Sequence, residues 1–419
     1  MFYTLAIIAW ANAKAVSCQR ISAFVPPRLF QFRVAPNPHE AMSKVTVDPV
    51  TTRKQQKQFI QLPWTLYRDE PNWIPPLLQE ERGLLNYAHH PFYERNEIQT
   101  FLAYRDGKIC GRIAAILNRV HIEYQNEQRG FFGFFECIDD EEVSTALFDA
   151  AKAWLANHDV HCMRGPTNPG LNYTWGTLVD TFDQPPTFMM TYNHHYYPRL
   201  IESYGFRQAQ DLFAFYGYRH MLPERRGKLE PIADVIRKRF DIQLRTLDKS
   251  RFVPEVQLFL ELYNQSMAKH WSFSPMSPAE VRHSAKGLRH LLVPEVTAVA
   301  EVDGRVIGAA FCLPDYNPII KKINGRLFPF GVFRLLYARR RTNRIRVVSA
   351  NVLPEYQKGV GIVLLKQVLE NGLELPANEV ECSWVAESNR LSRGALENAA
   401  ADNSRTYRMY DWDPDPSEE

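Results

Sequence analysis

The sequence has few cysteines, and their spacing does not build a site. Its 419 residues include six, at positions 18, 110, 137, 162, 312 and 382, with no CxxC pair. Cys110, Cys312 and Cys382 lie in apolar, strand-like runs, where a free cysteine behaves as a small buried hydrophobe. A disulfide framework or a zinc site is therefore not expected. The adjacent pairs His89-His90 and His194-His195 direct their side chains apart on a helix or strand, so we expect no metal site.

The chain also lacks a strong charge imbalance. It has 50 basic and 47 acidic residues and a net charge of +3. This charge is too small to indicate a nucleic-acid partner or a membrane surface. The densest basic stretch, Arg334–Arg346 (RLLYARRRTNRIR), has six arginines. It fits a solvated loop that leads into a strand, or a site that holds phosphate through the donor fork of arginine.

No apolar run is long enough to cross a membrane. The N-terminal run Phe2–Ala11 has about ten residues, whereas a spanning helix needs about 20. Ala11–Ala13 loosely fits a signal-peptidase site, but the run has no basic start. We expect residues 1–41 to be a disordered extension or the product of a misassigned start, with Met42 as the true one. A signal peptide is the less favoured alternative, and we expect a cytoplasmic protein without a membrane span.

Two landmarks recur along the chain at nearly the same offset. Ala103–Gly111 reads AYRDGKICG and Ala300–Gly308 reads AEVDGRVIG, a shift of 300 − 103 = 197 residues. Asn193 and Asn389 are 389 − 193 = 196 residues apart. This period is too long for a solenoid, whose repeats run about 20–50 residues, and indicates a duplicated domain. We place the units at 42–222 and 223–412, with 413–419 as a disordered tail.

Both units predict the same order of elements, which is a mixed α/β fold (mixed α+β sheet). Each has a hairpin around Asp-Gly, a strand, a helix, a strand, a helix and a final strand. The predicted elements of the first unit are Thr100–Tyr104, Ile109–Leu117, Arg129–Ile138, Glu141–Leu155, Val160–Arg164, Tyr196–Tyr204 and Asp211–Tyr218. Those of the second are Val296–Val302, Val306–Leu313, Arg344–Leu353, Gly361–Leu373, Val380–Val385, Leu391–Ala399 and Thr406–Trp412. The strand–helix junction before the parallel strand should open the sheet into a ligand crevice.

That junction in the second unit, Val352–Ile362 (VLPEYQKGVGI), has the composition of an anion site. Gly359 and Gly361 let backbone amides approach a ligand, the helix N-terminus adds its dipole, and Lys358 adds a cation. A tight turn with glycine at positive φ is the alternative. In the first unit the equivalent residues 137–142 read CIDDEE. Four acids at a helix N-terminus repel phosphate, so we expect the first unit to lack this site.

The run PEYQKGVGIVLLKQVL resembles the acyl-CoA-binding motif of the GNAT superfamily of N-acyltransferases. That motif reads Gln/Arg-x-x-Gly-x-Gly/Ala and opens a helix; here Tyr356 stands at the Gln/Arg position and Gln357 follows it. The stretches FLAYRDG, GFFE and RGPTNPG resemble a bacterial GNAT-like family with no assigned substrate. The resemblance covers roughly Val45 to Trp412 and implies two tandem GNAT-like domains. It also implies acyl-CoA (acetyl-CoA or longer) as co-substrate, held by Val352, Leu353, Gln357, Lys358, Gly359, Val360, Gly361, Ile362 and Asn389.

Acyl transfer requires a neutral amine, an N–H group for the oxyanion and a proton for the departing thiolate. GNAT enzymes use a strand amide, which here would come from Val348–Leu353, and often a tyrosine on the last helix. The last predicted helix, Leu391–Ala399, has no tyrosine. The nearest catalytic candidates are Tyr407, Tyr410 and Glu301, and the sequence does not decide between them.

The first unit has its own candidate site for substrate recognition. Arg164–Asn172 (RGPTNPGLN) is a Gly/Pro-rich loop, and loops carry function disproportionately. A structural loop, with Asn193 as the N-cap of the next helix, is the alternative. The candidate substrate residues are Asn168, Asn172, Tyr173, Trp175, Asp183, Tyr192 and Asn193.

The sequence therefore predicts an acyl-CoA-dependent N-acyltransferase, of acetyltransferase type, that acts on a small-molecule or peptide amine. We expect no nucleic-acid partner. Two alternatives stay open: a non-catalytic binding or scaffold protein with this fold, and a Fem-like transferase. The latter takes its acyl group from charged tRNA and needs a basic trough.

Overall fold

The structure is a computed structural model that describes residues 44–338, 341–357, 359–372, 374–397 and 404–414. From Val45 onward, the described residues belong to one compact unit. The predicted extension 1–41, most of the tail 413–419 and Lys358 lie outside the described residues.

The two Asp-Gly hairpins have the same conformation. Asp106 and Asp303 both have φ of 51°, and the glycines that follow have φ of 70° and 75°. Positive φ at both central residues defines the turn that best fits the twist of a two-stranded hairpin. Ala103 pairs with Gly111 and Ala300 with Gly308, and a bulge follows Ala103 and Ala300 alike. The predicted duplication is thus visible in the backbone.

The first half contains the predicted elements and several additional ones. Its helices are α1 (Arg53–Leu66), α2 (Leu78–Leu84), η1 (Pro91–Glu94), α3 (Arg119–Gln125), α4 (Glu141–Ala156) and α5 (Tyr197–Ser203). Its strands are β1 (Thr46–Pro49), β2 (Glu97–Arg105), β3 (Lys108–Leu117), β4 (Arg129–Cys137), β5 (Cys162–Gly165), β6 (Thr167–Asn168), β7 (Thr174–Trp175), β8 (Thr177–Leu178) and β9 (Arg207–Tyr218).

The second half repeats this order. Its helices are η2 (Arg219–Met221), α6 (Leu222–Phe240), η3 (Lys249–Arg251), α7 (Phe252–Met267), α8 (Pro278–Leu288), η4 (Pro294–Val296), α9 (Asn317–Lys322), α10 (Gly331–Ala338), η5 (Pro354–Tyr356), α11 (Val360–Gly372) and α12 (Arg390–Glu397). Its strands are β10 (Gln243–Arg245), β11 (Ala298–Val302), β12 (Arg305–Pro314), β13 (Arg344–Val352), β14 (Glu379–Ala386) and β15 (Ser404–Trp412).

One continuous 13-stranded sheet joins both halves, in the order β1-β2-β3-β4-β5-β15-β9-β14-β13-β12-β11-β10, with β8 paired to β15. This order is symmetric about the central pair, because β5 and β14, β4 and β13, and β3 and β12 occupy equivalent places on either side. The two final strands, β9 and β15, are exchanged. Each half is therefore completed by the last strand of the other, a pairing that the sequence pattern does not reveal.

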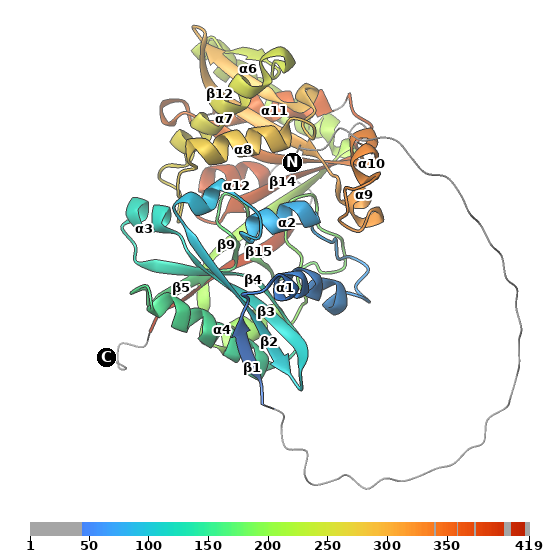
Figure 1. The fold of residues 1–419 in the computed structure, drawn as a ribbon. Coiled ribbons are helices and arrows are strands. Elements are labelled where there is room, and N and C mark those ends of the chain that lie inside the picture. The colour runs from blue at the N-terminus through green and yellow to red at the C-terminus, as the bar shows by residue number, and fades with distance from the viewer. Residues whose placement is uncertain (1–43, 339–340, 358, 373, 398–403, 415–419) are drawn as a thin grey trace, which may run out of the picture. The chain divides into compact units, whose positions relative to one another are not determined.

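Helices cover both faces of the sheet (Figure 1). In the second half, α6 and α11 pack on one face through a core that includes Ala233 and Val363. On the other face, α7 and α8 pack through a core that includes Val256 and Val281. Alternate strand residues point to opposite faces, so each strand contributes to both cores. The first half has the same layers, with α4 on one face and α1 on the other.

Candidate functional site

Strands β13 and β14 are paired where they begin and separate toward their ends. Their parallel register runs from Arg344–Glu379 to Val347–Cys382, and the described residues beyond it do not pair with each other. A bulge on β13 after Val347 interrupts its pairing with β12. Ala350, farther along β13, is exposed. The sheet is therefore open at this place, as expected, and one edge of β13 has backbone groups available to a ligand.

The glycine turn lies at the end of β13, before α11. Gly359 has φ of 108°, and a Cβ on it would lie 2.5 Å from Cδ1 of Ile236. Only glycine fits this position without strain. A Cβ on Gly361, in contrast, would meet nothing within 4 Å. The start of α11 therefore has open space beside Gly361, and a helix N-terminus next to open space is an arrangement that can bind a phosphate.

The other predicted cofactor residues surround this turn in different ways. Val352, Leu353 and Val360 are buried in the core beneath it, and Ile362 packs against that core. Gln357 is exposed. Asn389 caps α12 by accepting a hydrogen bond from the amide of Ser392 at 3.2 Å. The topology brings the starts of α11 and α12 to the same edge of the sheet.

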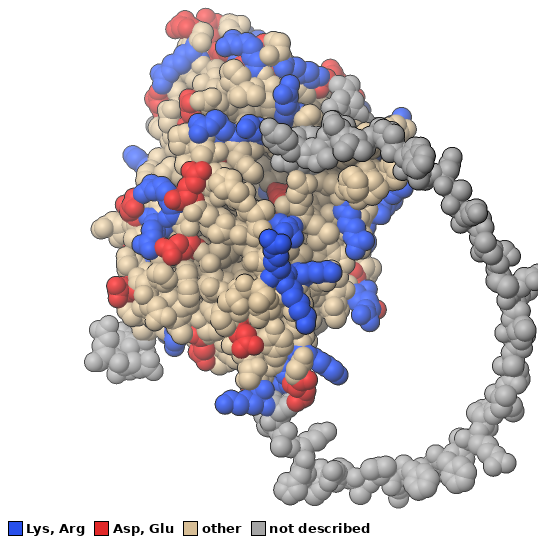
Figure 2. Space-filling view, in the orientation of Figure 1, with Lys and Arg blue, Asp and Glu red and all other residues tan. Residues whose placement is uncertain are grey.

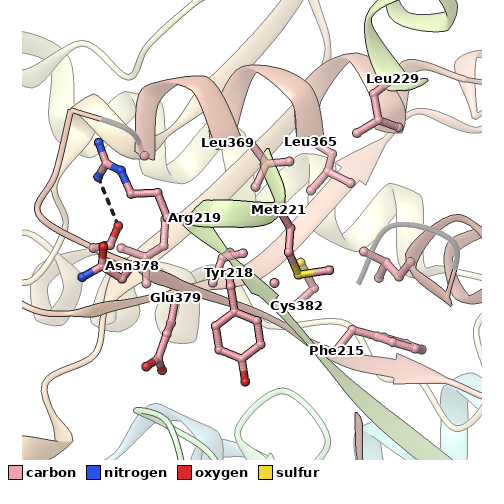
Figure 3. Close-up of a pocket in the computed structure, with 16 residues that line it drawn as sticks. Phe215, Tyr218, Arg219, Met221, Leu229, Leu365, Leu369, Asn378, Glu379 and Cys382 are labelled. Atoms are coloured by element: carbon pink, nitrogen blue, oxygen red, sulfur yellow. Dashed lines mark hydrogen bonds between the residues drawn. The ribbon is translucent and has the colours of Figure 1, made fainter. Parts of the chain in front are cut away.

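An apolar pocket lies on the α11 face of the sheet, next to the point where β13 and β14 separate. Its volume is about 730 Å³ when the part open to solvent is counted. Apolar residues line most of it, and polar residues gather at one end (Figure 3). The lining residues are Phe215, Gly217, Tyr218, Arg219, Met221, Leu229, Ile345, Leu365, Leu369, Gly372, Ala377, Asn378, Glu379, Val380, Cys382 and Leu396. Cys382 is also the last residue of β14 that pairs with β13, so the pocket adjoins the crevice.

A buried polar cluster occupies the opposite face of the same strands. Arg346 donates to the hydroxyl oxygen of Ser383 at 2.9 Å and to the carbonyl oxygen of Phe188 at 3.0 Å. Glu381, which is fully buried, accepts from Ser383 at 2.5 Å and from the hydroxyl of Thr187. Burial lowers the pKa of Arg346, although Glu381, 3.9 Å away, opposes the shift. Thr187 and Phe188 come from the first half, so this segment lies across the strands of the second half.

Beside this cluster, four side chains carry buried donor atoms that have no hydrogen-bond partner among the described residues. We call Tyr216, Trp384, Arg405 and Tyr407 the Arg405 cluster. Neither hydroxyl, nor the indole nitrogen, nor any guanidinium nitrogen of Arg405 has a hydrogen-bond partner among the described residues. Arg405 and Tyr407 are fully buried, and the rings of Trp384 and Tyr407 lie 6.0 Å apart. Trp384 follows the last residues of β14 that pair with β13, so the cluster lies next to the crevice.

Unpartnered buried donors are unfavourable, because each has lost its hydrogen bonds to water. Burial and the nearby Glu381 raise the pKa of Tyr216 and of Tyr407. Both hydroxyls therefore keep their protons at neutral pH. All four side chains can donate to oxygen atoms of a ligand.

The three catalytic candidates lie in different places. Tyr407 belongs to the Arg405 cluster. Tyr410 lies in the core of the first half, where its hydroxyl donates to Glu202 at 3.1 Å. Glu301, on β11, accepts from Arg245 at 2.8 Å in an ion pair. Of the three, the structure brings only Tyr407 to the crevice.

Most of the substrate candidates join the two halves or shape the loop. Asn172 donates to the carbonyl of Ser274, and Tyr173 donates to Glu280, each at 2.8 Å. The side chain of Asn193 accepts a hydrogen bond from the amide of Leu178 at 2.7 Å and donates one to its carbonyl oxygen at 3.1 Å. It does not cap α5. Asn168 accepts from the amide of Phe134, the hydroxyl of Tyr192 donates to the carbonyl of Phe182, and Asp183 is exposed.

Trp175 is the substrate candidate that reaches the crevice. Its ring lies 5.8 Å from that of Trp384 and 6.5 Å from that of Trp271, with which it stacks. The first half thus contributes an aromatic wall beside the Arg405 cluster.

The equivalent crevice of the first half is filled by its own chain. A Cβ on Gly133, in β4, would lie 1.7 Å from the carbonyl oxygen of Thr167. The four acids at the start of α4 are also engaged. The side chain of Asp140 caps the helix, Arg105 pairs with Asp140 and Glu142, and Arg199 pairs with Asp139 and Glu141. These features leave no anion site at the start of α4 in the described residues.

Sequence reasoning missed most of the polar residues of the site. The signal that could have found them is alternation in central strands: Arg344 and Arg346, Glu379 and Glu381, and Arg405 and Tyr407 are each two residues apart. Such pairs point to one face of a strand. In the middle of a sheet that face is buried, where charged groups are rare.

Basic and acidic side chains mix over most of the face drawn in Figure 2, with a small basic group over α1 and α2. Among the described helices, none combines the length and the apolar character needed to cross a bilayer.

Comparison with known proteins identifies relatives over nearly the whole chain. It is 33% identical over 379 residues to the bacterial ceramide synthase of Caulobacter vibrioides, covering 88% of this chain and 97% of that protein. It is 32% identical over 364 residues to protein YghO of Escherichia coli, covering 85% of this chain and 92% of that protein. No family model matches the chain.

Among solved structures, one match is a fungal multi-domain β-N-acetylglucosaminidase with a GCN5-related glucosamine N-acetyltransferase region. The TM-score is 0.51 at 15% identity, over 89% of this chain and 38% of that longer one. At this identity the likeness shows the fold alone. The predicted fold class, a mixed α/β structure of two tandem GNAT-like domains, is confirmed.

Proposed function

This chain belongs to the family that contains the bacterial ceramide synthase of Caulobacter vibrioides and protein YghO of Escherichia coli, and from this membership we propose that it is an acyl-CoA-dependent N-acyltransferase for a long-chain amine. The observation that carries the proposal is the apolar pocket, which reaches Cys382, the last residue of β14 that pairs with β13. We keep the units 42–222 and 223–412 as the proposed halves of the duplication, with the acyl donor bound by the second.

The acyl donor, acyl-CoA, would bind along the open edge of β13. The amides at the start of α11 would hold the pyrophosphate of coenzyme A, because a helix N-terminus and its dipole favour an anion there. Gly361 leaves room for this approach. The acyl chain would pass the end of the β13–β14 pairing into the apolar pocket, whose lining excludes water from it.

The acceptor would approach from the opposite face, where the Arg405 cluster lies. A ceramide is a long-chain amino alcohol whose nitrogen carries a fatty acyl group, so oxygen atoms adjoin the reacting amine. Those oxygens can accept the unpartnered hydrogen bonds of Arg405, Tyr407, Tyr216 and Trp384. This arrangement explains why the cluster consists of donors.

The reaction forms a C–N bond between the amine and the thioester carbon and breaks the C–S bond. The amine must be neutral to attack, and its extra proton leaves as the thiolate departs and is protonated. Donors beside the thioester lower the barrier by stabilising its oxygen as negative charge develops. Tyr407 is the proposed catalytic residue, because its hydroxyl is protonated, buried and next to the crevice.

The proposal is tested by incubating the purified protein with acetyl-CoA or palmitoyl-CoA and a panel of amines. The panel is sphinganine, hexadecylamine and ethanolamine, with thiol release and amide product measured together. We expect palmitoyl-CoA with sphinganine to give the highest kcat/KM. Thermal stabilisation by palmitoyl-CoA without thiol release on any amine would instead support a non-catalytic binding protein.

A further inference from the structure

Four large apolar side chains are exposed on α10 and the loop before it. Phe328, Phe330, Phe333 and Tyr337 are 88%, 69%, 64% and 66% exposed, and we call them the aromatic patch. Phe333 and Tyr337 are four residues apart on α10 and therefore share its outer face. Exposed apolar groups in such proximity mark interaction sites, whereas scattered single ones need no explanation.

The patch is carried on a fixed support. On the inner side of α10, Leu335 is buried in the core that also contains Ile320 of α9. A Cβ on Gly331 would lie 2.2 Å from the carbonyl oxygen of Arg326, so the turn into the helix is tightly packed. The indole nitrogen of Trp64 donates to the side chain of Asn324 at 2.6 Å, which ties the α9–α10 segment to the first half. Figure 1 shows α9 and α10 side by side at the surface.

The charged residues that flank the patch along the sequence have one sign. From Tyr316 to Pro354 the sequence has no Asp or Glu, and it has nine basic residues: Lys321, Lys322, Arg326, Arg334, Arg339, Arg340, Arg341, Arg344 and Arg346. Lys322, Arg326, Arg334 and Arg341 are exposed. The guanidinium of Arg341 lies 4.1 Å from the ring of Tyr337, which keeps this charge next to the aromatic surface. The net charge of +3 for the whole chain conceals this local concentration.

We propose that the aromatic patch and its basic neighbours dock the protein on an anionic lipid surface. Aromatic side chains favour the headgroup level of a bilayer, and basic residues beside them add about 1 kcal/mol each near an anionic surface. A short amphipathic element with both features binds in the plane of the interface. The patch could instead bind a protein partner with an acidic face or a second copy of this chain. The test must distinguish these two from a lipid surface.

The position of α10 relates this surface to the apolar pocket. The α9–α10 segment connects the end of β12 to the start of β13. The start of β14 lies at the same end of the sheet. The backbone carbonyl oxygen of Asn343, one residue before β13, accepts a hydrogen bond from the backbone amide of Asn378 at 2.8 Å. Asn378 and Glu379 line the pocket. The docking surface and the pocket therefore lie at the same end of the sheet, which suits an enzyme whose substrates have long hydrocarbon chains.

The test is flotation of the full-length protein with vesicles, without acyl-CoA or amine, so its outcome does not depend on the proposed reaction. Vesicles of phosphatidylcholine alone are compared with vesicles containing 30% phosphatidylglycerol (about a third of the lipid, enough to make the surface anionic). We expect binding to the anionic vesicles only, weakened by added salt.

Two sets of variants locate the contact. Phe330→Ser with Phe333→Ser should abolish binding, whereas Val253→Ser, on the exposed face of α7, should not change it. Arg334→Gln should weaken binding about fivefold, the equivalent of about 1 kcal/mol for one basic residue. Lys108→Gln, at an exposed hairpin in the first half, is the matched control. Melting temperatures check that each variant folds.

Three results would overturn the proposal. The wild-type protein could fail to bind anionic vesicles, or the double serine variant could bind as well as the wild type. The third is a dimeric wild type in vesicle-free solution that the double variant converts to a monomer, which would assign the patch to a second copy.

Discussion

The carbonyl oxygen of Thr167 occupies the place where a side chain on Gly133 would begin, 1.7 Å from an ideal Cβ. This contact fills the crevice of the first half with the chain's own Gly-Pro-Thr-Asn loop. In the second half, the corresponding strands separate and the glycine turn is open. The duplicated fold has therefore become asymmetric, with one candidate donor site.

We expect one molecule of palmitoyl-CoA to bind per chain. At 100 times its dissociation constant it should stabilise the fold by about 2.7 kcal/mol. Gly361→Trp should abolish this stabilisation, because the new ring occupies the space above α11 without contacting the protein. Gly287→Trp, at an equally open position on α8, is the control. Isothermal titration calorimetry measures the stoichiometry; two sites per chain would show that the first half binds as well.

Filling the pocket should change the preference for acyl chain length. Leu369 lines the pocket on α11, and Leu369→Trp should lower kcat/KM at least tenfold for palmitoyl-CoA but little for acetyl-CoA. The effect follows from the loss of space for a hydrocarbon chain, since each buried CH₂ contributes about 0.8 kcal/mol. Leu258→Trp, at a partly exposed position on α7, should alter neither rate. An equal loss for both donors would place the chain elsewhere.

Arg405 should contribute to turnover and not to stability. None of its guanidinium nitrogens has a described partner in hydrogen-bond geometry, although the charge lies close enough to Tyr407 to oppose the rise in the pKa of that hydroxyl, so Arg405→Met breaks few contacts and removes a buried charge. We expect unchanged or greater stability in urea, with a loss of at least tenfold in kcat/KM for sphinganine. Tyr407→Phe should behave in the same way.

Tyr410→Phe provides the opposite control. It loses a hydrogen bond to Glu202 and should cost about 1 kcal/mol of stability while leaving turnover unchanged. If Arg405→Met unfolds the protein, the side chain has a structural role that the proposal does not include.

Asp315 should make stability depend on pH. Burial, with help from Glu381, raises its pKa to about 6, although the amide of Asn317 and Arg344 oppose the shift. Its ordinary pKa is near 3.8. The folded state therefore holds the proton more tightly than the unfolded state, and stability is lost as pH rises from about 4 through 6.

Asp315→Asn keeps the oxygen that accepts from the amides of Phe188 and Asn317. The variant should match the wild type near pH 4 and exceed it by about 2 to 3 kcal/mol above pH 7. Urea unfolding across this range provides the measurement. If Asp315→Asn were less stable than the wild type at pH 8, the fold would need the charged carboxylate of Asp315.

Local patterns predicted the elements of the repeated order and the glycine turn, but not additional helices such as α1, α7 and α8. The Asp-Gly hairpins, the capped helix α4 and the turn at Gly359 depend on residues close in sequence, so their structure could be predicted. The exchange of β9 and β15 could not, because both strands fit either half equally well by pattern. The Arg405 cluster depends on that exchange, since it combines Tyr216 of one final strand with Arg405 and Tyr407 of the other.

The candidate substrate loop shows the same limit. Asn172 and Tyr173 have the composition of a recognition site, yet their partners are Ser274 and Glu280, about a hundred residues away along the chain. Amide and hydroxyl groups that bind a substrate and those that join two domains look alike in a sequence. Only Trp175, through its contact with Trp384, reaches the crevice.

The central claim is that the second half transfers a long acyl chain to the nitrogen of a long-chain amine. Its most direct test is quantification, by mass spectrometry, of the amide formed from palmitoyl-CoA and sphinganine, together with the coenzyme A released. We predict equal amounts of the two products with the wild type and with Gly287→Trp, and neither with Gly361→Trp. Binding of palmitoyl-CoA without any amide product from sphinganine or hexadecylamine would contradict the claim.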